Sequence, residues 1–186
     1  MYNIFNSLRL LCLMAIATIT TSAQAADPAE VVATLSRLGL TVSTAESCTG
    51  GDIAHLITEV PGSSAAFKGG AVTYWSDAKV DVLGVEQAVI DTCGVVSAEV
   101  VRQMAQGACR VFHTDCAVAT SGIAGPTGAE PGKPVGTVWI AVRTPEGSAE
   151  YLCHFDGDRR QIIDQAARTT LNLLLKHLDS TSAPSL

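Results

Sequence analysis

The stretch TAESCTGG (residues 44–51) decides the fold. It directly follows residues 40–44, which alternate between apolar and polar side chains as a strand does. It precedes residues 52–59, where Ile53, Leu56 and Ile57 recur at helical spacing. A glycine-rich turn between a strand and a helix is typical of α/β proteins, in which ligands bind beyond the carboxyl ends of the strands. The stretch therefore predicts an α/β domain with a ligand site at this turn.

The segments on either side of this turn continue the alternation of strands and helices. Asp27-Pro28 begins a predicted helix over residues 27–38, and Gly39 ends it. Further helices are predicted at residues 77–83, 97–111 and 160–178, and further strands at residues 69–75, 116–120, 135–143 and 149–155. We expect a three-layer α/β/α sandwich around a mixed, mostly parallel sheet, with an antiparallel hairpin at one edge.

Composition and charge narrow the classes of partner. The 186 residues suit one domain, and 47% hydrophobic with 16% charged residues favours a packed globule. The net charge is −6 and the basic residues are scattered, which argues against a nucleic-acid or anionic membrane partner. A small molecule is the partner that these properties favour.

The amino-terminal 25 residues have the pattern of a secretory signal peptide. Arg9 precedes a mostly apolar run over residues 10–19, and Ala23-Gln24-Ala25 resembles a cleavage site. We therefore expect a periplasmic or secreted domain over residues 26–179, free of the membrane once processed, with a disordered tail over residues 180–186. The alternative is a true start at Met14, which would leave the protein in the cytoplasm.

The cysteines indicate buried thiols rather than a metal or disulfide framework. Cys12 lies in the leader, and the other five have no metal-type pair spacing: Cys48, Cys93, Cys109, Cys116 and Cys153. An odd number leaves at least one unpaired within a monomer, and a domain of this size does not need disulfides. We expect free thiols, no metal and no cofactor.

A second glycine-rich turn follows another predicted strand. SGIAGP (residues 121–126) comes directly after residues 116–120. Either turn alone could be ordinary turn chemistry, but two that each leave a strand favour one shared crevice.

Ser47, at the first strand exit, is a candidate nucleophile. The amides of Cys48 and Thr49 would follow it and could stabilise an oxyanion. The alternative is that Ser47 only caps the next helix. Cys48 is a rival nucleophile, but nothing beside it in the sequence suggests a Cys/His pair.

The base is the less obvious member of the site. None of the four histidines, which are His55, His113, His154 and His177, lies in a glycine-rich loop. A lysine can act instead when burial lowers its pKa, and Lys79, at the end of VTYWSDAK (residues 72–79), is the candidate. The alternative is that Lys79 is solvated, as a lysine at the start of a helix usually is.

Taken together, the motifs resemble the nicotinamide mononucleotide deamidases, the family of the carboxy-terminal domain of CinA proteins. The resemblance covers about residues 29–178 and is carried by TAESCTGG, VPGSSAAFKGGAVTYWSDAK (60–79), LGV (83–85), GVVSAEVV (94–101), SGIAGPTGAEPGKPVGTVW (121–139) and GDRR (157–160). It implies hydrolysis of the carboxamide of nicotinamide mononucleotide to nicotinate mononucleotide and ammonia, without a cofactor. It also implies a homodimer.

The resemblance assigns roles residue by residue. Ser47 would be the nucleophile, Lys79 its base, and Tyr74 would orient Lys79 or donate to the developing charge. The residues implied in substrate binding are Thr49, Gly50, Gly51, Ser64, Ser121, Gly122, Gly125, Thr127, Gly128 and Arg159.

The sequence departs from the family pattern at two places. Trp75-Ser76 stands where the family commonly has Ser-Asn, and Gly128-Ala129 where it commonly has Gly-Gly. We expect the indole to reshape the pocket wall. Without the pyrophosphatase-like domain of longer CinA proteins, we expect a stand-alone deamidase. Two other functions stay open: a non-catalytic nucleotide-binding module, and an amidase for another small phosphorylated amide.

Overall fold

One mixed five-stranded sheet forms the centre of the protein in a computed structural model that describes residues 27–181. The strand order is β2-β1-β3-β4-β5. β1 pairs in parallel with β2 and β3, whereas the β3–β4 and β4–β5 pairs are antiparallel. The strands are β1 (Val42–Glu46), β2 (Phe67–Val72), β3 (Cys116–Gly122), β4 (Thr137–Thr144) and β5 (Gly147–His154).

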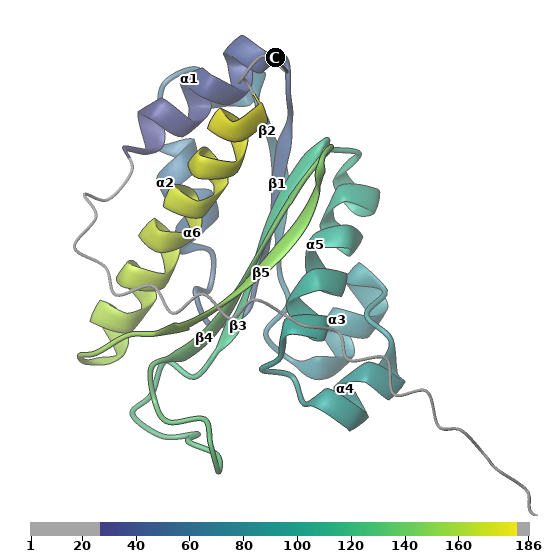
Figure 1. Ribbon diagram of the computed structural model, residues 1–186, viewed down its shortest axis with the longest axis vertical. Helices are drawn as coiled ribbons and strands as arrows, with labels where there is room; N and C mark the ends of the chain where they lie inside the picture. Colours follow the sequence, from purple (N-terminus) through teal and green to yellow (C-terminus); the bar gives the residue numbers. More distant parts are fainter. Residues whose placement is uncertain (1–26, 182–186) are drawn as a thin grey trace, which may run out of the picture.

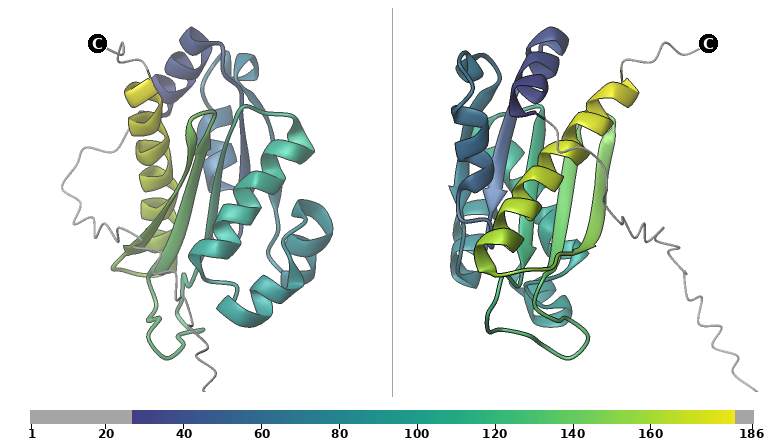
Figure 2. Two further views of the ribbon diagram at one scale, coloured as in Figure 1. Left: turned by 45° about the vertical axis from the view of Figure 1, so that its right-hand side comes forward. Right: turned by 90° about the vertical axis from the view of Figure 1, so that its left-hand side faces the viewer.

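Helices cover both faces of this sheet, which confirms the predicted three-layer sandwich (Figures 1 and 2). One face carries α1 (Pro28–Leu38), α2 (Asp52–Thr58) and α6 (Arg159–Thr181), which contact one another. The other face carries α3 (Ser76–Leu83), α4 (Gln87–Cys93) and α5 (Ala98–Phe112). A single-turn 3₁₀ helix, Ser63–Ala65, precedes β2.

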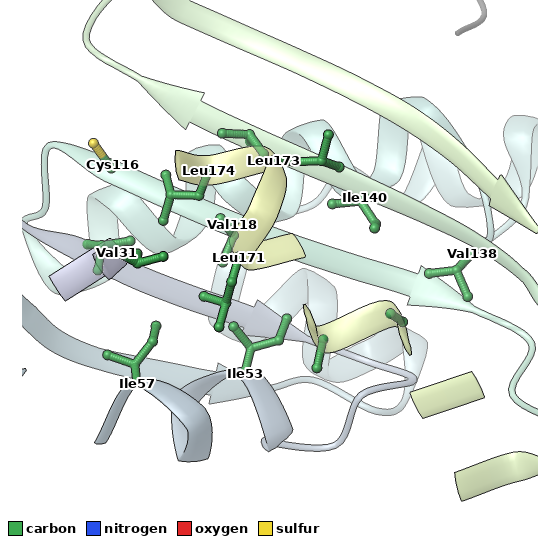
Figure 3. Close-up of a cluster of buried hydrophobic side chains, with 14 of the residues drawn as sticks. Val31, Ile53, Ile57, Cys116, Val118, Val138, Ile140, Leu171, Leu173 and Leu174 are labelled. Carbon is green, nitrogen blue, oxygen red and sulfur yellow. The ribbon is translucent and has the colours of Figure 1, made fainter. Parts of the chain in front are cut away.

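The two faces have different cores. Large aliphatic side chains fill the space between the sheet and α1, α2 and α6, among them Val31, Ile53, Val118, Ile140 and Leu171 (Figure 3). On the other face the sheet presents alanines to α5, namely Ala45, Ala117, Ala119 and Ala141. Because these side chains are small, α5 packs close to the sheet. Burial of both apolar sets stabilises the sandwich at roughly 25 cal/mol per Å².

The predicted helix starts are confirmed by their caps. The Asp27 side chain accepts a hydrogen bond from the amide of Ala29, and Ser97 Oγ accepts one from the amide of Val100. Gly39 ends α1 in the left-handed region, with φ 67°, where glycine is free of strain. Helix α4 was not predicted; it is short, and only Ile90 in it is buried.

Several boundaries differ by a few residues from the sequence analysis; the strand predicted at residues 69–75, for example, spans Phe67–Val72, so Tyr74 and Trp75 follow it. β1 begins at Val42 and ends at Glu46, so that Ser47 follows the strand directly. α6 continues to Thr181 and thus includes the first two residues of the predicted tail. The rest of that tail and the predicted signal peptide lie outside the described residues. Within residues 27–181, no helix has the length and apolarity needed to cross a membrane.

Within residues 27–181 all five cysteines are free, as predicted. Three are buried and two are partly exposed.

Candidate active site

The carboxyl ends of β1, β2 and β3 meet at one edge of the sheet and form a pocket there. Glu46 lies opposite Val72 of β2 and Thr120 of β3, so the residues that follow these three strands converge. The pocket has a volume of about 330 Å³, a size that suits a small molecule. Its lining includes Ser47, Lys79, Gly122, Thr127 and Arg159. Residues of both glycine-rich turns, among them Ser47 and Gly122, therefore line one pocket.

Ser47 and Lys79 are in direct contact in this pocket. The Nζ of Lys79 lies 3.0 Å from the Oγ of Ser47. Lys79 is only 1% exposed, and burial lowers the pKa of its amine from 10.5 to about 8. An amine with this pKa is partly neutral near physiological pH and can then accept a proton from Ser47. The geometry thus rules out the alternative of a solvated Lys79.

Two main-chain carbonyls hold the amine toward Ser47. Lys79 Nζ donates to the carbonyl of Thr73 at 2.7 Å and to that of Tyr74 at 3.4 Å. Both residues follow β2 directly. Within residues 27–181, Lys79 has no carboxylate within salt-bridge distance, and the interaction with Cys48 that raises its pKa is smaller than the effect of burial.

Cys48, the rival nucleophile, has a thiol of low nucleophilicity. Burial raises the pKa of its thiol to about 12, and the nearby Thr120 hydroxyl lowers it only in part. The thiol is therefore protonated at neutral pH, whereas only a thiolate is strongly nucleophilic.

The first glycine-rich turn binds a carboxylate of its own chain. The side chain of Glu46 accepts hydrogen bonds from Thr49 Oγ1 and from the amide of Gly51, at 2.7 and 3.0 Å. Thr49, Gly50 and Gly51 are absent from the pocket lining. The amide of Gly51 is therefore engaged by Glu46, and a role of Thr49, Gly50 and Gly51 in substrate binding stays a prediction.

The second glycine-rich turn does line the pocket. Its predicted binding residues Ser121, Gly122, Gly125, Thr127 and Gly128 are all in the lining. Ser121 Oγ donates to the carbonyl of Val95 at 2.7 Å, so this hydroxyl helps to shape the wall.

Arg159, the first residue of α6, also lines the pocket. Its Nη1 donates to the carbonyl of Gly125 at 2.7 Å, and its Nη2 donates to the hydroxyl of Tyr74 at 2.9 Å. The resemblance implied that Tyr74 orients Lys79 or donates to the developing charge. Its main-chain carbonyl accepts from Lys79 Nζ, and its hydroxyl accepts from Arg159.

Two further residues named in the sequence analysis lie outside the pocket lining. Ser64 is exposed in the 3₁₀ helix before β2, at the end of that strand away from the pocket, and it does not line the pocket. Trp75 is 77% exposed and is also absent from the lining, so the indole does not reshape the wall.

Sequence reasoning missed Glu46, Thr73 and Thr120, which support the pair through buried contacts. Glu46 could have been noticed, because a charged residue ends an otherwise uncharged strand. The two threonines give no comparable signal. Within the described residues, no histidine lines the pocket, and no three His, Cys, Asp or Glu side chains gather as metal ligands would.

Comparison with known proteins places this geometry in a family. The CinA C-terminal domain family matches residues 25–178. The chain belongs to the CinA C-terminal domain family. Among solved structures, this CinA domain is similar to the competence/damage-inducible protein CihA from Agrobacterium tumefaciens. The TM-score is 0.77 and the identity 41%, over 86% of this chain and 99% of that one.

Curated relatives of this CinA domain are of two lengths. A putative competence-damage inducible protein from Caldicellulosiruptor saccharolyticus is 48% identical over 78% of this chain, but the match covers only 36% of the relative. The nicotinamide-nucleotide amidohydrolase PncC of Pseudomonas putida is 45% identical over 81% of this chain and 97% of its own length. The CinA domain therefore spans about a third of the length of the former relative and nearly all of the latter.

Proposed function

We propose that this protein is an amidohydrolase that converts nicotinamide mononucleotide to nicotinate mononucleotide and ammonia. The observation that carries the proposal is the buried contact of 3.0 Å between Lys79 Nζ and Ser47 Oγ in a pocket of small-molecule size. The similarity to a nicotinamide-nucleotide amidohydrolase supports the choice of substrate.

In the first half-reaction, neutral Lys79 takes the proton of Ser47 as Oγ attacks the carboxamide carbon. The amide of Cys48, a residue of the pocket lining, stabilises the negative charge on the former carbonyl oxygen. The C–N bond then breaks, Lys79 returns the proton to the leaving nitrogen, and ammonia departs. The nicotinoyl group remains as an ester on Ser47.

In the second half-reaction, Lys79 takes a proton from a water molecule that attacks the ester carbon. The ester bond breaks, and the proton passes to Ser47 Oγ. Nicotinate mononucleotide leaves, and the enzyme is restored. Because one amine serves both halves, the reaction needs no metal ion or cofactor.

The phosphate of the substrate is bound at Arg159. Arg159 supplies a guanidinium, and Thr127 and Gly128 line the pocket beside it. The amino end of α2 does not take this role because Glu46 already occupies it.

An amidase for another small phosphorylated amide is the main alternative function. It was favoured by the expectation that Trp75 reshapes the pocket wall, and Trp75 is not part of that wall. Trp75 is exposed and absent from the pocket lining, whereas Ser76, the other residue of that departure, does line the pocket. The deciding experiment measures ammonia release by residues 26–186 from nicotinamide mononucleotide and from a panel of other carboxamides. Ammonia release from other carboxamides alone would mean that the protein is an amidohydrolase for a different substrate.

We also propose that the domain is exported, since the leader pattern lies ahead of the family match, which begins at residue 25. The enzyme would then act on external pyridine nucleotides. Residues 1–30 fused to a reporter that is active only after export test this idea, and an uncleaved cytosolic fusion would contradict it.

A further inference from the structure

Glu46 is a buried carboxylate immediately before the proposed nucleophile, and it is 1% exposed. Its Oε2 accepts hydrogen bonds from Thr49 Oγ1, from the amide of Gly51 and from the amide of Ile53, at 2.7, 3.0 and 3.1 Å. Its Oε1 accepts one from the amide of Ala54 at 2.9 Å. A carboxylate with four donors at the positive end of a helix is strongly held.

This carboxylate closes the turn that carries Ser47. The turn starts at Glu46, and Thr49 and Gly51 at its far end donate hydrogen bonds to the Glu46 side chain. Gly51, the residue that caps α2, offers no side-chain cap of its own, so Glu46 supplies that cap from five residues away. The position of Ser47 is thus fixed from both ends of a short loop.

The main chain of Glu46 also locates the base. Its carbonyl accepts a hydrogen bond from the amide of Thr73 at 2.9 Å, and the carbonyl of Thr73 holds Lys79 Nζ at 2.7 Å. The same residue is therefore linked to the nucleophile through its side chain and to the base through its backbone.

A third connection runs from Glu46 to β3. Thr49 Oγ1, which donates to Glu46, lies 2.8 Å from Thr120 Oγ1, and the Thr120 carbonyl accepts from the amide of Ser47 at 3.0 Å. The buried chain Glu46–Thr49–Thr120 thus ties the turn to the strand that leads into the second glycine-rich loop.

We propose that Glu46 is a positioning residue whose carboxylate sets the place of Ser47 relative to Lys79. This inference rests on the proposed function. A displacement of about 1 Å at a reacting group can reduce a rate by about 10²-fold, so a neutral side chain at this position lowers the reactivity of Ser47 in a folded protein. Substrate binding at Arg159 is left intact.

The test compares Glu46→Gln with Asp115→Asn. Asp115 is a matched control because its carboxylate also accepts hydrogen bonds from a main-chain amide and a hydroxyl, both of Thr41, but at the end of β1 away from the pocket. The readouts are kcat, KM, the folded fraction by thermal melting, and the rate at which a fluorophosphonate probe labels Ser47. Labelling forms the Oγ–P bond and releases fluoride, and it does not depend on the nucleotide.

For folded Glu46→Gln we expect kcat and the labelling rate to fall together by about 10²-fold while KM changes by less than about threefold. Asp115→Asn is expected to keep the wild-type values of all three. A folded Glu46→Gln protein that is labelled at the wild-type rate would overturn the proposal. So would a fall in labelling of the same size in Asp115→Asn.

Should Glu46→Gln not fold, Thr49→Val tests the same chain, because it removes one donor to Glu46 and leaves three. A labelling rate in Thr49→Val equal to that of the wild type would then overturn the proposal. Labelling also separates this inference from the choice of substrate. Wild-type protein that is labelled but inactive on nicotinamide mononucleotide would refute that substrate alone, and protein that is neither labelled nor active would refute both proposals.

Discussion

Lys79 Nζ donates a hydrogen bond of 3.0 Å to Ser47 Oγ, although 32 residues separate the two in sequence. Parallel pairing of β1 with β2 brings them together, since Ser47 follows one strand and α3, which carries Lys79, begins shortly after the other. Burial then gives the amine a pKa of about 8. The fold thus supplies both the position and the protonation state that a serine–lysine pair requires.

Replacing Ser47 should abolish turnover without unfolding the protein. We expect Ser47→Ala to lower kcat by about 10³-fold or more, because the attacking oxygen is lost. Cys48→Ala is the matched control, since the protonated Cys48 thiol takes no part in the reaction, and it should keep most of the activity. Ammonia release by the two variants checks this. Loss of activity in Cys48→Ala alone would transfer the role of nucleophile to the thiol.

The pH dependence of the rate should follow Lys79. In the proposed mechanism the neutral amine is the base, so kcat/KM should rise tenfold per pH unit below about pH 8 and level off above it. Lys79→Met removes the base and should leave about 10³-fold less activity. A profile that is flat between pH 6 and 9 would be incompatible with this assignment.

Stability should also depend on pH through Lys79. Its pKa is about 8 in the folded state and near 10.5 when unfolded, so the unfolded chain binds more protons between these values. The free energy of unfolding therefore rises with pH over this window, by on the order of 3 kcal/mol for this group. Denaturant melts of wild type and Lys79→Met at pH 7.5 and 10.5 measure the difference. An equal pH response in the two proteins would contradict the lowered pKa.

Arg159 should act mainly on substrate binding. A hydrogen bond to a charged group is worth about 1.5–3 kcal/mol, so Arg159→Ala should raise KM by about ten- to a hundredfold with a smaller effect on kcat. The neighbouring Arg160 is a matched control, because it pairs with Asp52 and does not line the pocket. Steady-state kinetics of both variants decide the matter, and an unchanged KM in Arg159→Ala would remove this residue from the phosphate site.

The sequence predicted the parts of the site that lie within continuous motifs. Ser47, Lys79 and the turn at residues 121–126 each stand in a long motif, and the strand pattern places them at one edge of the sheet. The contact between Tyr74 and Arg159 could not be predicted in this way, because it joins residues 85 positions apart through the packing of α6.

The first glycine-rich turn shows a different limit of predicting a binding site from sequence. Its sequence indicated an anion site, and it does bind an anion, but the anion is the side chain of Glu46. A carboxylate attached to the same turn has a high effective concentration and outcompetes a diffusing phosphate. Helix α4 was missed because a segment of seven residues with one buried side chain gives no clear period.

The occupied amino end of α2 has a consequence for the design of inhibitors. A compound whose acidic group is aimed at that helix would meet the negative charge of Glu46 rather than free amides. A boronic acid placed at Ser47 and joined by a ribose-length spacer to an acidic group facing Arg159 would instead match the charges that the pocket presents. Selectivity over phosphate-binding helices in other enzymes would come from that arrangement.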